Sequence, residues 1–237
     1  MRGTIKGVAF DLDGTLYPNY RLNLRLLPFV FKELRFLTAF GRARDIIRGN
    51  QVKGLLPAGD FYLYQAEKLA EVLSESGESA HCFSCAESLK EKTERLIYRG
   101  WEPIFKNVKL FNGAKETLAA LKNSGYKMGL LSDFPPQTKL TYLGIDNVWD
   151  AVLCSECSGA LKPHPQSFKD LAAAMSLPCE EILYVGNSRK YDVCGAAGAG
   201  MKTAWIKSRF FPGSGLKKPK PDFSFYSYRQ LFNFMIK

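Results

Sequence analysis

The spacing of hydrophobic and polar positions changes along the chain, and the change predicts where strands and helices lie. The segment 5–10 is apolar, with β-branched and aromatic residues, which predicts a buried strand. Between residues 17 and 107 the apolar positions recur every three or four residues, which predicts helices. After residue 112, short apolar runs alternate with helical segments. The chain therefore combines a helical stretch with an alternating one.

Three helices are expected in the first stretch. They cover roughly Pro28 to Arg48, Asp60 to Ser76, and Ser84 to Tyr98. Pro28 suits the first turn of a helix, and Gly77 and Gly100 suit positions just beyond a helix end. No pattern typical of parallel strands interrupts the stretch, so we expect an all-helical insert.

The second stretch alternates helices with strands. The expected helices cover 113–124, 136–143, 165–175 and 189–199, and the expected strands cover 127–131, 151–154, 182–185 and 202–206. Such alternation builds right-handed βαβ units around a mostly parallel sheet. We therefore expect an α/β fold with a Rossmann-like parallel sheet, formed by residues 1–17 and 108–237. Residues 18–107 are expected to form a smaller all-helical domain.

The net charge of +10 is concentrated in two segments. Between residues 20 and 54 eight Lys and Arg face two acids, and from residue 201 onward eight more face only Asp222. Such segments suit a phosphorylated substrate, nucleic acid or an anionic membrane surface, or they are simply solvated faces. Nucleic acid is disfavoured because no RNA-binding signature with interleaved aromatic residues accompanies them. Arg42, Arg44 and Arg48 in the first helix suit an anionic substrate.

The chain has the composition of an ordinary globular protein, with 46% hydrophobic and 24% charged residues. The apolar stretch from Leu22 to Phe40 is interrupted by four charged residues, so it does not predict a membrane span. The residues after Met1 lack the apolar region and cleavage site of a signal peptide. We therefore expect a cytoplasmic protein.

Two Cys-x-x-Cys pairs, Cys82/Cys85 and Cys154/Cys157, raise the alternatives of a zinc site or a redox pair. The pairs lie about seventy residues apart in the sequence, and the first falls where a helix is expected to begin. Reduced, partly buried thiols are the favoured interpretation for a chain of this kind.

Polar residues follow each of four expected strands. In chain order they are Asp11 and Asp13, then Ser132 and Asp133, then Lys162, then Asn187 and Asp192. The carboxyl ends of parallel strands meet at one edge of the sheet, so these side chains are expected to converge there. Two neighbouring carboxylates repel one another, and a divalent cation is the simplest compensation.

Each of these residues also has an ordinary structural use. Asp11 and Asp13 flank a segment that suits a turn, Ser132 suits a helix N-cap, and Lys162 suits an exposed surface. Their joint occurrence at successive strand ends favours an active site.

The four motifs in this order resemble those of the haloacid dehalogenase superfamily. They are Asp11-Leu12-Asp13-Gly14-Thr15, Ser132, Lys162, and Gly186-Asn187 with Asp192. The resemblance implies a Mg²⁺-dependent phosphatase that hydrolyses a small phosphorylated metabolite through an aspartyl-phosphate. It also implies that the helical insert is a cap. Dehalogenases of the superfamily lack the second acid of the first motif, so Asp13 favours phosphate ester hydrolysis.

The resemblance also implies a role for each residue. Asp11 would be the nucleophile, and Asp13 would protonate the leaving group and then activate water. Phosphoryl oxygens would be held by the backbone after Asp11, at Leu12 and Asp13, and by Ser132 and the neighbouring Asp133, with Lys162 balancing charge. Mg²⁺ would be held by Asp11, the carbonyl of Asp13, Asn187 and Asp192.

The fourth motif departs from the family pattern, because Asn187 stands where the first acid is usual. An Asn oxygen can still bind Mg²⁺, but without a charge. The second motif departs mildly, with Asp133 where Asn is common. Two alternatives stay open: a phosphomutase with the same core, and a catalytically weakened scaffold that binds an anionic partner through its basic surfaces.

Overall fold

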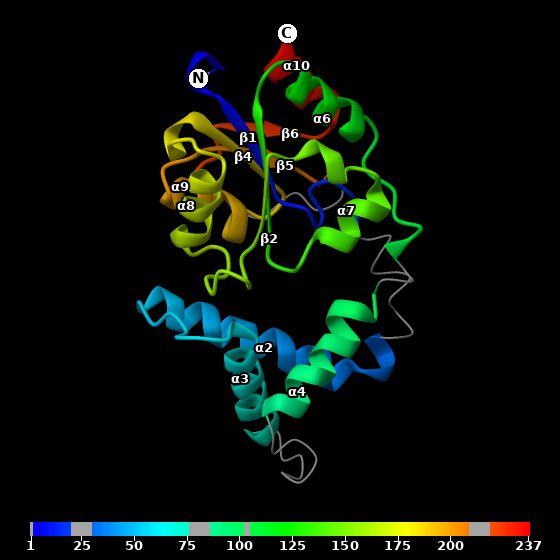
Figure 1. Ribbon diagram of the computed structural model, residues 1–237, viewed down its shortest axis with the longest axis vertical. Helices are drawn as coiled ribbons and strands as arrows, with labels where there is room; N and C mark the ends of the chain where they lie inside the picture. The colour runs from blue at the N-terminus through cyan, green and yellow to red at the C-terminus, as the bar shows by residue number, and fades with distance from the viewer. Residues whose placement is uncertain (1, 20–29, 76–85, 102–104, 209–218) are drawn as a thin grey trace.

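A six-stranded, fully parallel sheet forms the centre of the molecule, as a computed structural model shows (Figure 1). The structure describes residues 2–19, 30–75, 86–101, 105–208 and 219–237. The strands are β1 (Gly7–Phe10), β2 (Lys127–Ser132), β3 (Ala151–Cys154), β4 (Ile182–Gly186), β5 (Lys202–Ile206) and β6 (Phe223–Phe225). Their order across the sheet is β3-β2-β1-β4-β5-β6, so β1 is central.

The alternation of side chains along β1 joins two hydrophobic cores, one on each face of the sheet. Val8 and Phe10 pack into one core, and Ala9 packs into the other. All four residues of β1 are buried because the strand has a neighbour on either side and helices on both faces. Such burial explains why the strand is apolar throughout.

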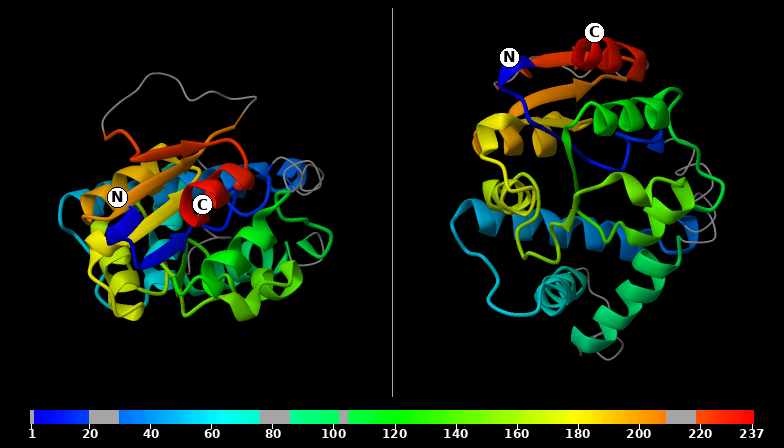
Figure 2. Two further views of the ribbon diagram at one scale, coloured as in Figure 1. Left: turned by 90° about the horizontal axis from the view of Figure 1, so that it is seen from above. Right: turned by 45° about the horizontal axis from the view of Figure 1, so that its top comes forward.

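Helices cover both faces of the sheet (Figures 1 and 2). On one face lie α6 (Ala114–Asn123), α7 (Gln137–Leu143) and α10 (Tyr228–Ile236), and on the other lie α8 (Pro165–Ala174) and α9 (Cys194–Gly198). A π-helix, η6 (Arg189–Val193), leads into α9. Short 3₁₀ turns complete the connections: η1 (Arg2–Thr4), η4 (Asp146–Val148) and η5 (Cys179–Glu181).

A separate helical layer faces the carboxyl ends of the strands (Figure 2, right). It consists of α2 (Leu34–Val52), α3 (Phe61–Glu75), α4 (Ala86–Thr93) and the π-helix η3 (Glu94–Arg99). On α2 the buried residues Phe36, Ala39, Phe40 and Ala43 recur every three or four positions, as an amphipathic helix requires. They pack with Leu69 and its neighbours on α3, so the layer has a core of its own.

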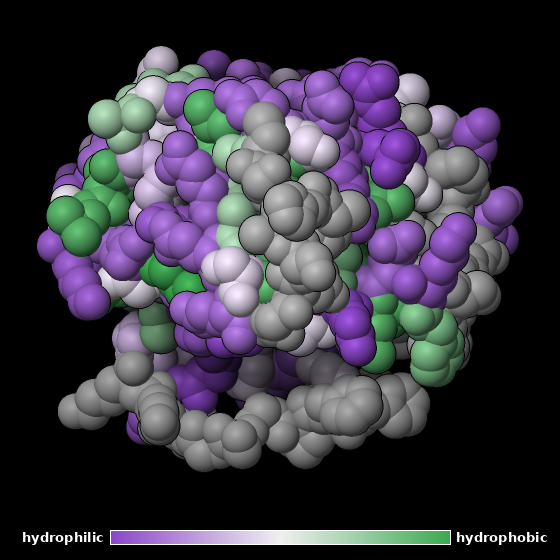
Figure 3. Space-filling model, turned by 90° about the horizontal axis from the view of Figure 1, so that it is seen from below, coloured by the Kyte–Doolittle hydropathy of each residue, from purple (hydrophilic) through white to green (hydrophobic). Residues whose placement is uncertain are grey.

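The outer face of the helical layer is largely hydrophilic in its described part (Figure 3). Hydrophobic side chains appear there in small separate groups between hydrophilic ones. No helix among the described residues is long and apolar enough to cross a membrane.

Buried ion pairs join α2 to the sheet. Arg44 donates to Glu156, which has no exposed surface, and also to Gln65 on α3 at 3.1 Å. Arg48 donates to Asp133 Oδ2 at 2.9 Å, and Arg44 lies 3.3 Å from the same oxygen. Burial lowers the pKa of Arg44 from its ordinary value, and Asp133 partly offsets that shift. Arg44 and Arg48, which look free in the sequence, are therefore paired with acids from the loops after β2 and β3.

The α/β prediction is confirmed, and the five predicted strands form with small changes at their ends. The predicted helix 189–199 consists instead of η6 followed by α9. Part of the first predicted helix lies outside the described residues, and α2 continues to Val52, beyond Arg48. The sequence analysis missed β6 and α10. The strand β6 has only three residues, which is too short to show a period.

The buried pair between Arg44 and Glu156 predicts a large effect of losing one partner. Arg44→Met should lower the free energy of unfolding by about 3–5 kcal/mol in urea titrations, because the carboxylate of Glu156 is left buried without a counter-charge. Arg42→Met is the matched control on the same helix, since Arg42 and its partner Glu75 are both exposed, and it should change stability by less than about 1 kcal/mol.

A double variant separates charge from packing. Replacing both partners, Arg44→Met with Glu156→Leu, should recover most of the lost stability, because a buried ion pair and an apolar pair are often close in stability. An equal free energy of unfolding for Arg44→Met and Arg42→Met would show that the buried pair does not hold α2 against the rest of the molecule.

Candidate active site

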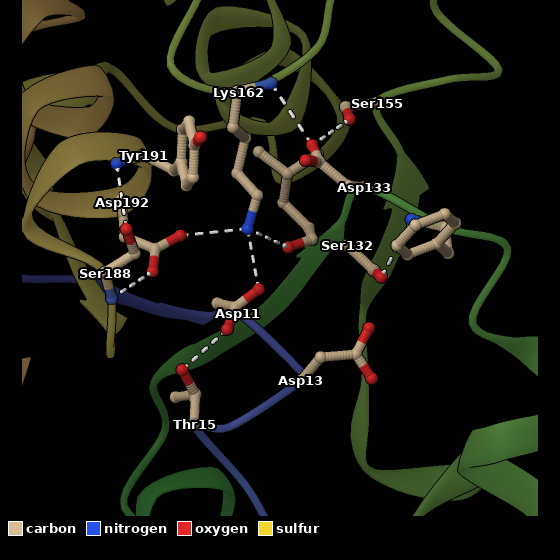
Figure 4. Close-up of polar contacts among 12 residues, drawn as sticks. Asp11, Asp13, Thr15, Ser132, Asp133, Ser155, Lys162, Ser188, Tyr191 and Asp192 are labelled. Carbon is tan, nitrogen blue, oxygen red and sulfur yellow. Dashed lines mark hydrogen bonds and ion pairs between the residues drawn. The ribbon is translucent and has the colours of Figure 1, made fainter. Parts of the chain in front are cut away.

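Four strand ends bring acidic, basic and hydroxyl side chains together (Figure 4). Asp11 follows β1, Ser132 ends β2, Lys162 lies in the loop after β3, and Asp192 lies on η6 after β4. The strands are parallel and in register, which is why residues distant in sequence meet at this edge.

Asp11 is almost completely buried, with 6% of its surface exposed. Its Oδ1 accepts a hydrogen bond from Lys162 Nζ at 2.6 Å, and its Oδ2 accepts one from Thr15 Oγ1 at 2.6 Å. Burial raises the pKa of Asp11 to about 7, while Lys162 opposes the shift and the carboxylate of Asp192 adds to it. Both oxygens are therefore fixed in direction by protein donors.

Lys162 links Asp11 to the fourth motif. Its Nζ lies 2.9 Å from Asp192 Oδ1, and Lys162 as a whole is 4% exposed. Burial alone would lower the pKa of Lys162, but Asp11 and Asp192 hold it well above its ordinary value. The other oxygen of Asp192 accepts from the backbone N–H of Ser188 at 2.8 Å. Each oxygen of Asp192 thus accepts one hydrogen bond and keeps a lone pair that could bind a metal ion.

Asp13 lies on the more open side of the site, and its side chain is 27% exposed. Lys139, on α7, contacts both of its oxygens at 2.6 and 2.8 Å, and the Tyr17 hydroxyl donates to Oδ1. The sequence analysis missed Lys139, because a lysine in the first turn of a helix carries no motif. The ion pair fixes the position of the Asp13 carboxylate next to Asp11.

Ser132 is fully buried at the end of β2, where its Oγ accepts from the backbone N–H of Phe134 at 3.2 Å. This bond leaves the hydroxyl hydrogen available for a bound anion. Asp133, the next residue, engages a different set of groups. Its Oδ1 accepts from Ser155 Oγ at 2.5 Å and from the Lys162 backbone at 3.2 Å, and its Oδ2 faces Arg48.

Asp133 therefore contacts Arg48 of the helical layer and two residues of the loop after β3, Ser155 and Lys162. Burial alone would raise the pKa of Asp133, but Lys162, Arg44 and Arg48 together lower it to about 2. Asp133 is thus a fixed anion at the joint between α2 and the sheet.

Asn187 lies against the turn that follows β1. Gly14 has a φ of +84°, and a Cβ at this position would lie 2.1 Å from Asn187 Nδ2. Only a glycine therefore lets the side chain of Asn187 approach the loop of Asp11 and Asp13 so closely. Within that loop the carbonyl of Leu12 accepts from the N–H of Thr15 and of Leu16, which closes a tight turn.

The donor set is compatible with a Mg²⁺ ion that keeps several waters. Asp11 offers a carboxylate and Asn187 offers an amide oxygen, both hard ligands. No group of three or more His, Cys, Asp or Glu residues that could hold a metal occurs among the described residues. A metal at this edge would therefore rely on few protein charges.

Cys154 and Cys157 are free thiols at the end of β3, while Cys82 and Cys85 lie outside the described residues. The Tyr62 hydroxyl lies 3.5 Å from Cys157 Sγ. Hydrogen bonds from Cys154 and Tyr62 lower the pKa of Cys157 to about 6, against the opposing effect of burial. Cys154 is buried, and its own pKa is raised.

Comparison with known proteins agrees with the geometry of this edge. Residues 5–200 match the haloacid dehalogenase-like hydrolase family. The chain is 25% identical to a phosphoglycolate phosphatase of Haemophilus influenzae over 99% of this chain and 100% of that protein. It is 37% identical to a glyceraldehyde 3-phosphate phosphatase of Pyrococcus abyssi, but that match spans 40% of this chain and only 41% of the relative.

A solved structure shares the fold. The L-2-haloacid dehalogenase of Xanthobacter autotrophicus superposes with a TM-score of 0.66 and 20% identity, over 97% of this chain and 98% of that one. The chain belongs to the haloacid dehalogenase-like hydrolases, since the family match covers most of its length.

The thiol of Cys157 should react as a thiolate near neutral pH. Its rate of alkylation by iodoacetamide, followed by mass spectrometry, should rise with pH through a midpoint near 6, because the deprotonated form is the nucleophile. Cys179 is the internal comparison, since burial raises its pKa and its midpoint should lie above 9, the ordinary value.

Tyr62→Phe removes one of the hydrogen bonds to the Cys157 sulfur and should move the Cys157 midpoint upward while leaving that of Cys179 in place. If Cys157 and Cys179 had the same midpoint in the unaltered protein, the lowered pKa of Cys157 would be contradicted.

Proposed function

We propose that this chain is a Mg²⁺-dependent phosphatase that hydrolyses a monoester of a small phosphorylated metabolite through an aspartyl-phosphate at Asp11. The observation that carries the proposal is the geometry of the first motif. Asp11 is buried and held by Lys162 and Thr15, while Asp13, two residues later, lies on the more open side. This arrangement supports a role for Asp11 as the nucleophile and for Asp13, which lies next to it, in proton transfer.

The first step forms a bond between a carboxylate oxygen of Asp11 and phosphorus and breaks the ester bond. Asp13 enters this step in its protonated form, and the departing alkoxide takes that proton. In the second step Asp13 accepts a proton from water, and the resulting hydroxide displaces Asp11 from phosphorus, which releases inorganic phosphate. A halide needs no proton when it leaves, whereas an alkoxide does, so an acid at position 13 favours ester hydrolysis over dehalogenation.

Charge on the transferring group is balanced by groups at the ends of three strands. Lys162 lies against Asp11, and Ser132 has a hydroxyl hydrogen to donate. The backbone N–H groups that follow Asp11, at Leu12 and Asp13, would hold the remaining phosphoryl oxygens. In this proposal Asp133 supports phosphate binding indirectly, through its contact with the Lys162 backbone.

Asp11, the Asp13 carbonyl, Asn187 and Asp192 would hold Mg²⁺. The ion would supply positive charge against the phosphoryl oxygens. Asn187 brings no charge, so the site would bind the ion more weakly than one with an acid at this position.

We further propose that residues 18–107 are a cap whose position over the strand ends excludes water from the reaction. The relatives named above act on phosphoglycolate and on glyceraldehyde 3-phosphate, both small phosphorylated compounds. This supports a small phosphorylated metabolite as the substrate.

Loss of the nucleophile should abolish turnover. Asp11→Asn should reduce release of inorganic phosphate at least about 10³-fold, because an amide does not attack phosphorus, while circular dichroism stays unchanged. Asp146→Asn is the control, since Asp146 is an exposed aspartate outside the site, and it should keep full activity.

The assay should cover sugar phosphates, nucleotides and an aryl phosphate, with and without Mg²⁺. More than a tenth of the original rate in Asp11→Asn would exclude the aspartyl-phosphate route. Transfer of phosphate within the substrate, without release, would identify a phosphomutase. If no compound reacts, the result would favour the alternative of a catalytically weakened scaffold that binds an anionic partner.

Restoring the missing charge should strengthen the metal site. Asn187→Asp should lower the Mg²⁺ concentration needed for half-maximal turnover, and it should increase the rise in melting temperature that Mg²⁺ causes, because an added carboxylate is a stronger ligand. Asn147→Asp adds the same charge at an exposed position elsewhere and should change neither quantity. Unchanged Mg²⁺ dependence in Asn187→Asp would remove Asn187 from the ligand set.

A further inference from the structure

A cavity of about 200 Å³ lies between α7 on one side and η3, Trp101 and Phe105 on the other. Five aromatic side chains contribute to its wall: Tyr98, Trp101, Phe105, Phe134 and Tyr142. For comparison, an engineered apolar cavity of roughly 150 Å³ holds a benzene molecule. The cavity is therefore large enough for a six-membered ring.

Two residues of the cavity wall contact the site at which the ester bond would break, one at Asp13 and one at Ser132. Lys139 lines it and contacts both oxygens of Asp13. Phe134 also lines it, and its backbone N–H donates to Ser132. The Lys139 ammonium lies 5.7 Å from the ring centres of both Phe105 and Phe134. A phosphoryl group at Asp11 would thus have its organic part directed toward these rings.

The charged groups in the wall are already paired. Arg99 Nε lies 2.9 Å from Glu94 Oε1, and Lys139 is neutralised by Asp13. The arginines of α2 that look suited to an anion are held by Asp133 and Glu156. No unpaired cation among the residues of this wall is left for a second anionic group on the substrate.

We propose that this cavity receives the leaving group, and that the substrate is a phosphate monoester of a ring-bearing, planar alcohol with no second anionic group. Aromatic side chains pack edge-to-face or offset against such a ring. The proposal rests on the proposed phosphatase function, because it places the leaving group beside Asp13. It sets this chain apart from a phosphoglycolate phosphatase, whose named substrate carries a carboxylate.

The test compares esters whose leaving alcohols are all primary: pyridylmethyl, benzyl and ethyl phosphate, together with phosphoglycolate. We expect kcat/KM for the two ring-bearing esters to exceed that for ethyl phosphate and phosphoglycolate at least about tenfold, since the ring is buried.

A pair of variants blocks the cavity without touching the reacting groups. Thr138 lines the cavity from α7 and is exposed, so Thr138→Trp should fill it and remove the preference for rings while ethyl phosphate is still hydrolysed. Thr141→Trp places the same bulk on the same helix outside the cavity wall, and it should keep the preference.

A binding measurement keeps this inference separate from the phosphatase proposal. Benzylphosphonate, which is not hydrolysed, should bind at least about tenfold more tightly than methylphosphonate by calorimetry, and Thr138→Trp should remove the difference. This result in a protein without turnover would support the cavity and reject the phosphatase. Turnover with no preference for rings, or equal binding of the two phosphonates, would overturn the inference about the leaving group.

Discussion

The buried contact of Lys162 with two carboxylates is the constraint around which the rest of the site is arranged. Asp11 and Asp192 come from different strand ends, and neither could be buried as an anion without the shared ammonium. The three side chains meet only if β1, β4 and the loop after β3 are correctly placed. The parallel register therefore also sets the geometry of the nucleophile.

A second set of buried charges fixes the helical layer over this edge. Arg44 and Arg48 on α2 reach Asp133 and Glu156 in the loops after β2 and β3, so charge pairs hold this helix at the strand ends, together with the apolar contact of Ile47 with Leu161. Because Arg44 and Arg48 are paired, these two arginines do not supply a free anion site at the strand ends. Selectivity can then come from the aromatic wall next to Lys139, in which shape and stacking matter more than charge.

The sequence analysis and the structure agree most closely where a signal is local. The strands of the core were predictable because each is a short apolar run bounded by turns, and Asp11, Ser132 and Lys162 were predictable because each follows such a run. The roles assigned to these residues are still predictions. Contacts between distant segments were not predictable: Lys139 with Asp13 is separated by 126 residues, and Arg44 with Glu156 by 112. Neither pair leaves a pattern in either segment alone.

The sequence by itself determined the α/β architecture, the order of the motifs and the edge of the sheet at which they meet, because periodicity and strand ends are local properties of the chain. Only the tertiary structure decided which partner each charge takes. Asp133 is adjacent to Ser132 in the sequence, yet it pairs with arginines from the helical layer, and Asp192 supports Lys162. The physical reason is that buried charges select partners by proximity in three dimensions, and that proximity exists only once the helical layer has packed over the sheet.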